Sequence, residues 1–264
     1  MITRLVKVEG AGNDFLLGTG SWAQRLADDP RLVVRLCNRH RGVGADGALS
    51  VFEDSTGTIR LVHRNADGSP SAFCANGTRC AARAAVELLG LPHDLIVVTG
   101  WAEIPAFVRT NDVTIELPPP AIPIDRNLET DDRFWRGRQL NLGVPHLVLP
   151  TKDLDSLPIK IVAPPLRHHP ELGPDGANVH FVELRSDRLR LRSYERGVEA
   201  ETLCCGSGVV VAALLALEST EQRSMVVEAR SGDRLTVEAL DEPPVAPSRL
   251  TGGARLVAEI EPLC

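Results

Sequence analysis

The chain has 264 residues, 43% of them hydrophobic, enough to bury a substantial core in one large domain or two of ordinary size. Its 29 basic and 35 acidic residues give a net charge of -6 and are mixed along the sequence, so a nucleic-acid partner is not expected. No apolar run is long enough to span a membrane as a helix, and the chain starts with a strand pattern instead of a signal peptide, which predicts a cytoplasmic protein with no membrane partner.

The first predicted elements are strands at residues 2–8 and 15–17, joined by a glycine-bracketed turn. A helix at residues 23–38, interrupted near Pro30, leads to residues 41–47, which match the G-x-G-x-x-G pattern of dinucleotide-binding proteins. That pattern needs a strand before it and a helix after it, whereas a strand follows here, so we interpret the segment as a tight turn that brings Asp46 near a site.

The rest of the first half reads as a strand, a polar turn, a buried helix and three more strands. The ranges are 59–63, 65–68, 78–89, 95–99, 103–109 and 113–117. Three consecutive prolines at 118–120 mark the clearest linker. We therefore expect an N-terminal domain of residues 1–117, joined by 252–264, and a C-terminal domain of residues 118–251.

The second half repeats this plan. Strands are predicted at 139–142, 147–149, 179–184, 189–194, 225–228, 234–239 and 254–260, and a buried helix at 209–217. Between the early strands runs a polar, proline-rich connection through His168 and His169. Neighbouring side chains rarely converge on one metal ion, so these two histidines are interpreted as loop residues.

Two short stretches relate the halves at one constant offset, roughly half the length of the chain. Cys74 aligns with Cys205 and Gly77 with Gly208, and each stretch opens an apolar, alanine-rich run. This pattern predicts a pseudo-duplication in which a cysteine precedes each of two buried helices.

A helix N-terminus favours anions, because its first N–H groups have no partner within the helix and its dipole is positive there. The same field is expected to lower the pKa of a thiol, so Cys74 and Cys205 are predicted to support thiolate chemistry. Six cysteines in a chain of this length do not resemble a secreted disulfide framework, and reduced thiols are expected: Cys37, Cys74, Cys80, Cys204, Cys205 and Cys264.

Paired cysteines without a histidine motif indicate an acid and a base acting on one carbon. One thiolate removes a proton from one face and the other thiol returns a proton to the opposite face, which inverts a stereocentre. The backbone N–H groups of four residues would hold the carboxylate of an amino acid substrate and stabilise the developing enolate: Ala75, Asn76, Gly206 and Ser207.

Six motifs, in this order and spacing, resemble those of the diaminopimelate epimerase family over nearly the entire chain: GAGNDFLL, RGVGADG, RNADGSPSAFCANGTRC, GVPH, GANVHFVE and YERGVEAETLCCGSG. The resemblance implies an isomerase that needs no cofactor, interconverts LL- and meso-diaminopimelate, and serves lysine and peptidoglycan precursor synthesis. It also implies an α+β fold of two pseudo-symmetric domains, each a curled, mostly antiparallel sheet around a central helix.

Carried over to this chain, the resemblance makes Cys74 and Cys205 catalytic and places Asn13 near the reacting centre. It assigns recognition of the distal amino acid group to Asn65, Asn178, Glu195 and Arg196. A guanidinium can hold a carboxylate through two hydrogen bonds, so Arg196 suits a substrate with a second carboxylate.

Three positions depart from the family pattern: Ala75, Val144 and Gly47. Val144 stands where some members have asparagine and removes a polar contact to the distal end, which bears on the identity of the substrate and not on the type of reaction. The nearest alternative is a two-cysteine racemase of the same fold acting on histidine or proline.

Other classes of protein fit the sequence less well. A pyridoxal-dependent racemase needs a lysine in a cofactor motif, and neither Lys7, Lys152 nor Lys160 lies in one. A redox-sensing or metal-binding protein remains as a non-enzymatic alternative, although the cysteine spacings are not those of zinc sites and no metal site is predicted. A homodimer is compatible with the sequence.

Overall fold

The computed structural model describes residues 3–130 and 133–262; Ile2, of the first predicted strand, and Cys264 lie outside them. The chain divides into two compact units. Unit 1 contains Met1–Glu116 and Thr251–Cys264, and unit 2 contains Leu117–Leu250. In the described part of the chain, no helix is long and apolar enough to cross a membrane.

Unit 1 is a curled, mostly antiparallel sheet with helices. Its elements are β1 (Arg4–Gly10), β2 (Asn13–Thr19), α1 (Ser21–Asp28), α2 (Pro30–Cys37), β3 (Gly47–Ser55), β4 (Thr58–Asn65), β5 (Pro70–Ser71), α3 (Ala75–Leu89), β6 (Asp94–Val98), β7 (Glu103–Val108), β8 (Asp112–Leu117) and β18 (Arg255–Glu259). β2–β3 and β4–β6 pair in parallel, and β1–β2, β3–β4, β6–β7, β7–β8 and β1–β18 pair antiparallel.

Unit 2 has the same plan. Its elements are β9 (Ile124–Thr130), β10 (Arg133–Leu142), β11 (Val144–Pro150), α4 (Ile159–Arg167), a 3-10 turn (Pro170–Leu172), β12 (Asn178–Leu184), β13 (Leu189–Glu195), β14 (Ala200–Thr202), α5 (Gly206–Leu217), β15 (Ser224–Glu228) and β16 (Arg234–Ala239). β17 (Ser248–Gly253) then leads the chain back into unit 1. β11–β12 and β13–β15 pair in parallel, as do their counterparts in unit 1.

The pseudo-duplication is confirmed element by element. The elements β2, β3, β4 and α3 of unit 1 start at positions 13, 47, 58 and 75, and β11, β12, β13 and α5 of unit 2 start at positions 144, 178, 189 and 206. All four pairs are separated by the same offset, which is also the offset between the two cysteines. The α+β fold of two pseudo-symmetric halves predicted from the sequence is therefore the observed one.

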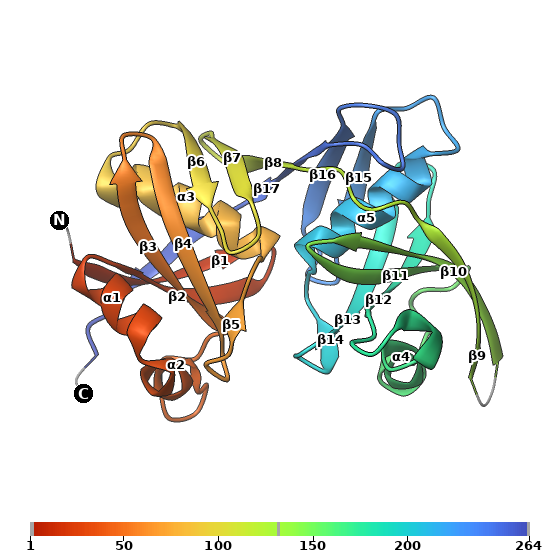
Figure 1. The fold of residues 1–264 in the computed structure, drawn as a ribbon, viewed down its shortest axis with the longest axis horizontal. Helices are drawn as coiled ribbons and strands as arrows, with labels where there is room; N and C mark the ends of the chain where they lie inside the picture. The colour runs from red at the N-terminus through yellow and green to blue at the C-terminus, as the bar shows by residue number, and fades with distance from the viewer. Residues whose placement is uncertain (1–2, 131–132, 263–264) are drawn as a thin grey trace. The chain divides into compact units, whose positions relative to one another are not determined.

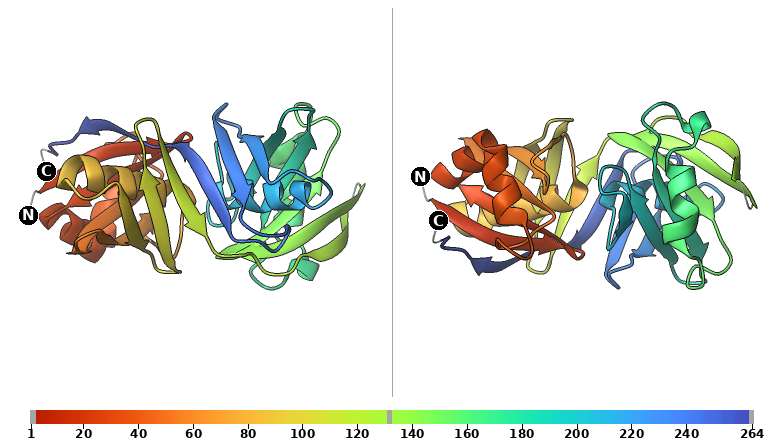
Figure 2. Two further views of the ribbon diagram at one scale, coloured as in Figure 1. Left: turned by 90° about the horizontal axis from the view of Figure 1, so that it is seen from above. Right: turned by 90° about the horizontal axis from the view of Figure 1, so that it is seen from below.

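Each unit encloses one helix. α3 packs against six neighbouring strands from β1 to β7 and against β18, and α5 packs against strands from β10 to β16. In Figures 1 and 2 the strands of each unit curve around its own helix. Every residue of α5 from Gly206 to Leu214 is buried, as expected for a helix that is apolar on all sides.

The predicted interruption of the first helical segment is also observed. Asp29 separates α1 from α2, and its carboxylate accepts hydrogen bonds from the backbone N–H groups of Arg31 and Leu32. Pro30 takes the first helical position, where a missing N–H costs nothing. Residues 41–46 then form the predicted turn, and β3, not a helix, follows it.

The prediction for the segment before His168 was wrong. It contains α4, which buries Ile159, Ala163 and Leu166 at helical spacing against β12 and β13. Pro164 and Pro165 lie inside this helix and account for the loop-like appearance of the sequence. β9 was not predicted either, because only one of its seven residues, Leu128, is buried.

Candidate active site

Cys74 is the N-cap of α3, and its side chain is half-buried. The Gly77 N–H donates to Sγ at 3.4 Å, and Sγ lies 3.7 Å from Oδ1 of Asn13. Asn76 donates to the same Asn13 oxygen at 3.4 Å. Unit 1 therefore brings together three of the predicted site residues, with Ala75 beside them as the first residue of the helix.

A charged network holds Asn13 in place. Asn13 donates to Asp46 at 2.7 Å, and Arg39 bridges Asp46 and Asp14 at 2.7 Å to each. Burial alone would raise the pKa of Asp14, but hydrogen bonds and charge from Arg39 and Lys7 outweigh burial and lower it to about 2. The turn at residues 41–46 thus positions Asp46 against the site, as predicted.

Asn65 lies at the end of β4, in its own turn. Its side chain donates to Ser69 at 3.0 Å, and Asp67 accepts from the same hydroxyl at 2.6 Å. None of the contacts described within unit 1 joins Asn65 to the Asn13–Cys74–Asn76 group. Its role in substrate binding stays a prediction.

Cys205 is the N-cap of α5 and is 4% exposed, so it is far more enclosed than Cys74. Burial and, second, the negative charge of Glu195 raise the pKa of Cys205 well above the usual value. Hydrogen bonds from the Gly208 N–H and the Ser207 hydroxyl lower this pKa without reversing the shift; Oγ of Ser207 lies 3.8 Å from Sγ of Cys205. The prediction that the helix field lowers the pKa of this thiol was therefore wrong. Loss of water outweighs the helix dipole here.

The remaining predicted residues of unit 2 lie at the ends of β12 and β13. Glu195 accepts a hydrogen bond from Thr202 across the β13–β14 pair. The Asn178 side chain accepts from the backbone N–H of Arg196 at 2.8 Å. The structure thus joins Asn178 to Arg196 and places Glu195 near Cys205, while Gly206 and Ser207 form the first turn of α5.

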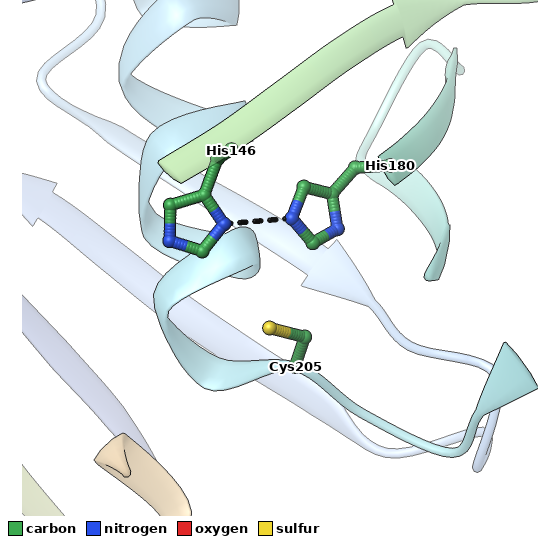
Figure 3. A group of neighbouring side chains, drawn as sticks. All are labelled: His146, His180 and Cys205. Atoms are coloured by element: carbon green, nitrogen blue, oxygen red, sulfur yellow. Dashed lines mark hydrogen bonds between the residues drawn. The ribbon is translucent and has the colours of Figure 1, made fainter. Parts of the chain in front are cut away.

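Two buried histidines beside Cys205 were not predicted as site residues. Nδ1 of His146 lies 2.8 Å from Nε2 of His180 (Figure 3). Nδ1 of His180 lies 2.8 Å from the Ser193 hydroxyl. Burial lowers the pKa of His146 to about 3, against an opposing effect of the Leu142 carbonyl, and lowers that of His180 well below the usual range. Both rings are therefore neutral near pH 7. The only sequence signal was that each histidine occupies a strand position that should be apolar.

These rings and the sulfur form the group in the described chain whose chemistry could hold a metal ion. Ligand atoms of His146, His180 and Cys205 all lie within 4.8 Å of one another. The three residues come from β11, β12 and the residue before α5. They are far apart in sequence, so no short metal-binding motif in the sequence predicts this group.

Comparison with known proteins gives a consistent result. The diaminopimelate epimerase family model matches residues 5–99 and 139–256. Diaminopimelate epimerases from Aquifex aeolicus and Chlorobaculum tepidum are 31% and 35% identical to this chain; the alignments cover 88% and 89% of it, and 88% and 93% of those proteins.

Solved structures share the fold at low sequence identity. A PhzF-family phenazine biosynthesis protein from Bacillus anthracis matches with a TM-score of 0.74 at 19% identity over 100% of both chains. A probable proline racemase from Agrobacterium radiobacter matches with a TM-score of 0.74 at 15% identity over 98% of this chain and 92% of that one. Sequence motifs, family model and close relatives agree that the chain belongs to the diaminopimelate epimerase family and is an isomerase of the epimerase class.

Proposed function

We propose that the chain interconverts LL- and meso-diaminopimelate without a cofactor, with Cys74 and Cys205 as the acid and base. The observation that carries the proposal is the repeat: in a member of this family, two cysteines at equivalent positions of the two halves each cap the N-terminus of an enclosed helix. A fold alone needs no cysteine at either cap, where serine, threonine, aspartate or asparagine serve better.

In the proposed mechanism, one sulfur removes the α-proton and the other donates a proton to the opposite face of the same carbon. Burial keeps Cys205 protonated, so this residue starts as the proton donor when Cys74 acts as base. The N–H groups at the starts of α3 and α5 hold the α-carboxylate and stabilise the enolate that develops as the proton leaves. Asn13, fixed by Asp46, orients the reacting amino acid group.

Recognition of the distal amino acid group falls to residues that carry complementary charge. Arg196 binds the distal carboxylate, Glu195 and Asn178 bind the distal ammonium or position Arg196, and Asn65 completes the contacts from unit 1. We further propose that the activity serves lysine and peptidoglycan precursor synthesis in the cytoplasm, where thiols stay reduced, and that the active protein is a homodimer.

The alternative is racemisation of histidine or proline on the same fold. It is favoured by Val144, which supplies no polar group toward a distal substrate end. α-Proton exchange in deuterated water separates the two, measured for LL-diaminopimelate, histidine and proline. We expect exchange and inversion of diaminopimelate alone.

Variants test the mechanism in the same assay. Cys74→Ala and Cys205→Ala are expected to lose inversion by at least about 100-fold, the usual contribution of a positioned acid or base. Cys80→Ala and Cys204→Ala, two other buried cysteines, are the matched controls and should retain it. Activity on another amino acid would change the substrate, and inversion that survives in either catalytic variant would refute the two-thiol mechanism.

A further inference from the structure

The row of buried, hydrogen-bonded side chains in unit 2, formed by His146, His180 and Ser193, is not required by the fold. At the offset that relates the two halves, His146 corresponds to Phe15 and His180 to Leu49, which unit 1 buries to 1% and 0% exposure. Hydrocarbon therefore fills the same places in the same architecture. Burying imidazoles costs free energy unless their nitrogens are satisfied, so the two histidines indicate an additional role.

Their hydrogen bonds leave one nitrogen unsatisfied. The two hydrogen bonds that join His146, His180 and Ser193 can both point toward Ser193 or both point toward His146. In either arrangement, Nε2 of His146 has no hydrogen-bond partner among the described residues. In one of these arrangements His180 donates Nδ1–H to Ser193 and keeps a lone pair on Nε2. A histidine that binds a metal ion usually has this arrangement.

We propose that His146, His180 and Cys205 form a binding site for a thiophilic divalent cation such as Zn²⁺, and that its binding reversibly inhibits the enzyme. Two imidazoles and one thiolate are ligands that Zn²⁺ prefers, and three protein ligands leave a fourth position for water. On binding, the Cys205 S–H bond breaks, the sulfur bonds to the metal and one proton goes to solvent. The proton between the two rings moves from Nδ1 to Nε2 of His146, so that both facing nitrogens present a lone pair to the metal. The inhibition rests on the proposed function, because a metal-bound sulfur cannot exchange protons with a substrate carbon.

The geometry needs only local adjustment. Zn–N bonds of about 2.0 Å and Zn–S bonds of about 2.3 Å in a tetrahedron hold the ligand atoms roughly 3.3–3.6 Å apart. The two facing ring nitrogens are 2.8 Å apart and the ligand atoms lie within 4.8 Å of one another, so the rings separate slightly and the sulfur approaches. In Figure 3 the Cys205 side chain lies beside both rings, at the start of α5.

Co²⁺ binding to the reduced protein tests the site without reference to turnover. A thiolate–cobalt charge-transfer absorbance saturating at one equivalent is expected. It should disappear in His180→Leu, which copies the residue of unit 1, and in Cys205→Ser. Exposed His168 supplies the matched control, and His168→Asn should keep the absorbance, as should Cys74→Ser.

Further readouts keep the result decisive. Circular dichroism checks that His180→Leu is folded, and His180→Asn replaces it if it is not. Absorbance that persists in the folded His180 variant, or that disappears in Cys74→Ser, would place the metal on other thiols and overturn the proposal. So would the absence of any thiolate absorbance in the wild type.

Inhibition is measured separately with Zn²⁺ in the α-proton exchange assay. We expect chelator-reversible inhibition of the wild type and at least a tenfold higher half-inhibitory Zn²⁺ concentration for the folded His180 variant, normalised to its own activity. Equal sensitivity of both proteins would refute the inhibitory role. If the wild type without Zn²⁺ exchanges no α-proton of diaminopimelate, the proposed function is refuted. The Co²⁺ absorbance would still test the metal site, because it does not depend on turnover.

Discussion

Gly208, the third residue of α5, is the point at which the helix and the histidine pair meet. A Cβ at this position would lie 2.2 Å from Cε1 of His180 and 2.7 Å from both ring nitrogens. Ordinary contacts begin near 3.4 Å, so Gly208→Ala must displace the ring by about 1 Å. The ring is held by 2.8 Å hydrogen bonds on both sides and cannot move without weakening them.

Three effects set the expected change in the free energy of unfolding. Alanine favours the helix by about 1 kcal/mol relative to glycine. Overpacking costs about 1–3 kcal/mol, and weakening two buried hydrogen bonds costs about 1–3 kcal/mol more. The steric and polar losses exceed the gain, so we expect Gly208→Ala to destabilise the protein by about 3 kcal/mol.

Urea denaturation measures this change, and the repeat supplies the control. At Gly77 in α3, an added Cβ would lie 3.1 Å from the flexible end of Leu49 and 3.6 Å, an ordinary contact, from Cβ of Cys74, so Gly77→Ala should stay within about 1 kcal/mol of the wild type. In a His180→Ala background the clash is gone, and Gly208→Ala should become neutral or stabilising. Wild-type stability of the single variant, or an equal loss with and without the His180 ring, would refute the reasoning.

Two further predictions follow from the ionisable groups. The pKa of Asp14 is about 2 in the folded protein against 3.8 ordinarily, so the unfolded state takes up the proton first as the pH falls. The ionised Asp14 side chain therefore stabilises the fold by about 2 kcal/mol above pH 4, and this stabilisation is lost toward pH 2. In urea denaturation, Asp14→Asn should be less stable than the wild type by about this amount at pH 7 and equally stable near pH 2. Iodoacetamide at pH 8 should modify Cys74 before Cys205, because Cys74 is half-buried and burial raises the pKa of Cys205. Peptide mass spectrometry of the treated native protein measures the order, and earlier modification of Cys205 would contradict the structure.

The sequence was informative where the signal is local or repeated. The apolar runs of α3 and α5 predicted two buried helices, and the repeat predicted the pseudo-symmetry; both are observed. The catalytic role of the cysteines before these helices stays a proposal. α4 was not predicted, because prolines such as Pro164 and Pro165 normally end a helix. Here the burial of Ala163 and Leu166 outweighs that preference.

The histidine cluster could not be predicted because it depends on strand register. His146 and His180 are distant in sequence, and only the parallel pairing of β11 with β12, which sets His146 opposite Asn178, brings the rings together. The pKa of Cys205 depends in the same way on tertiary structure. A helix N-terminus is visible in the sequence, but the burial that outweighs it is a property of the folded chain.

The two halves share one architecture but not one environment around the sulfur. In unit 1, Cys74 is half-buried, with the polar side chain of Asn13 beside it and the hydrocarbon of Leu49 behind its helix. In unit 2, Cys205 is enclosed and lies near the carboxylate of Glu195, which favours the protonated thiol. An inversion by two groups needs one to hold a proton while the other lacks it. The repeat supplies two equivalent positions, and in unit 2 burial and Glu195 keep the Cys205 thiol protonated, which is the state that the proposed mechanism requires of the proton donor.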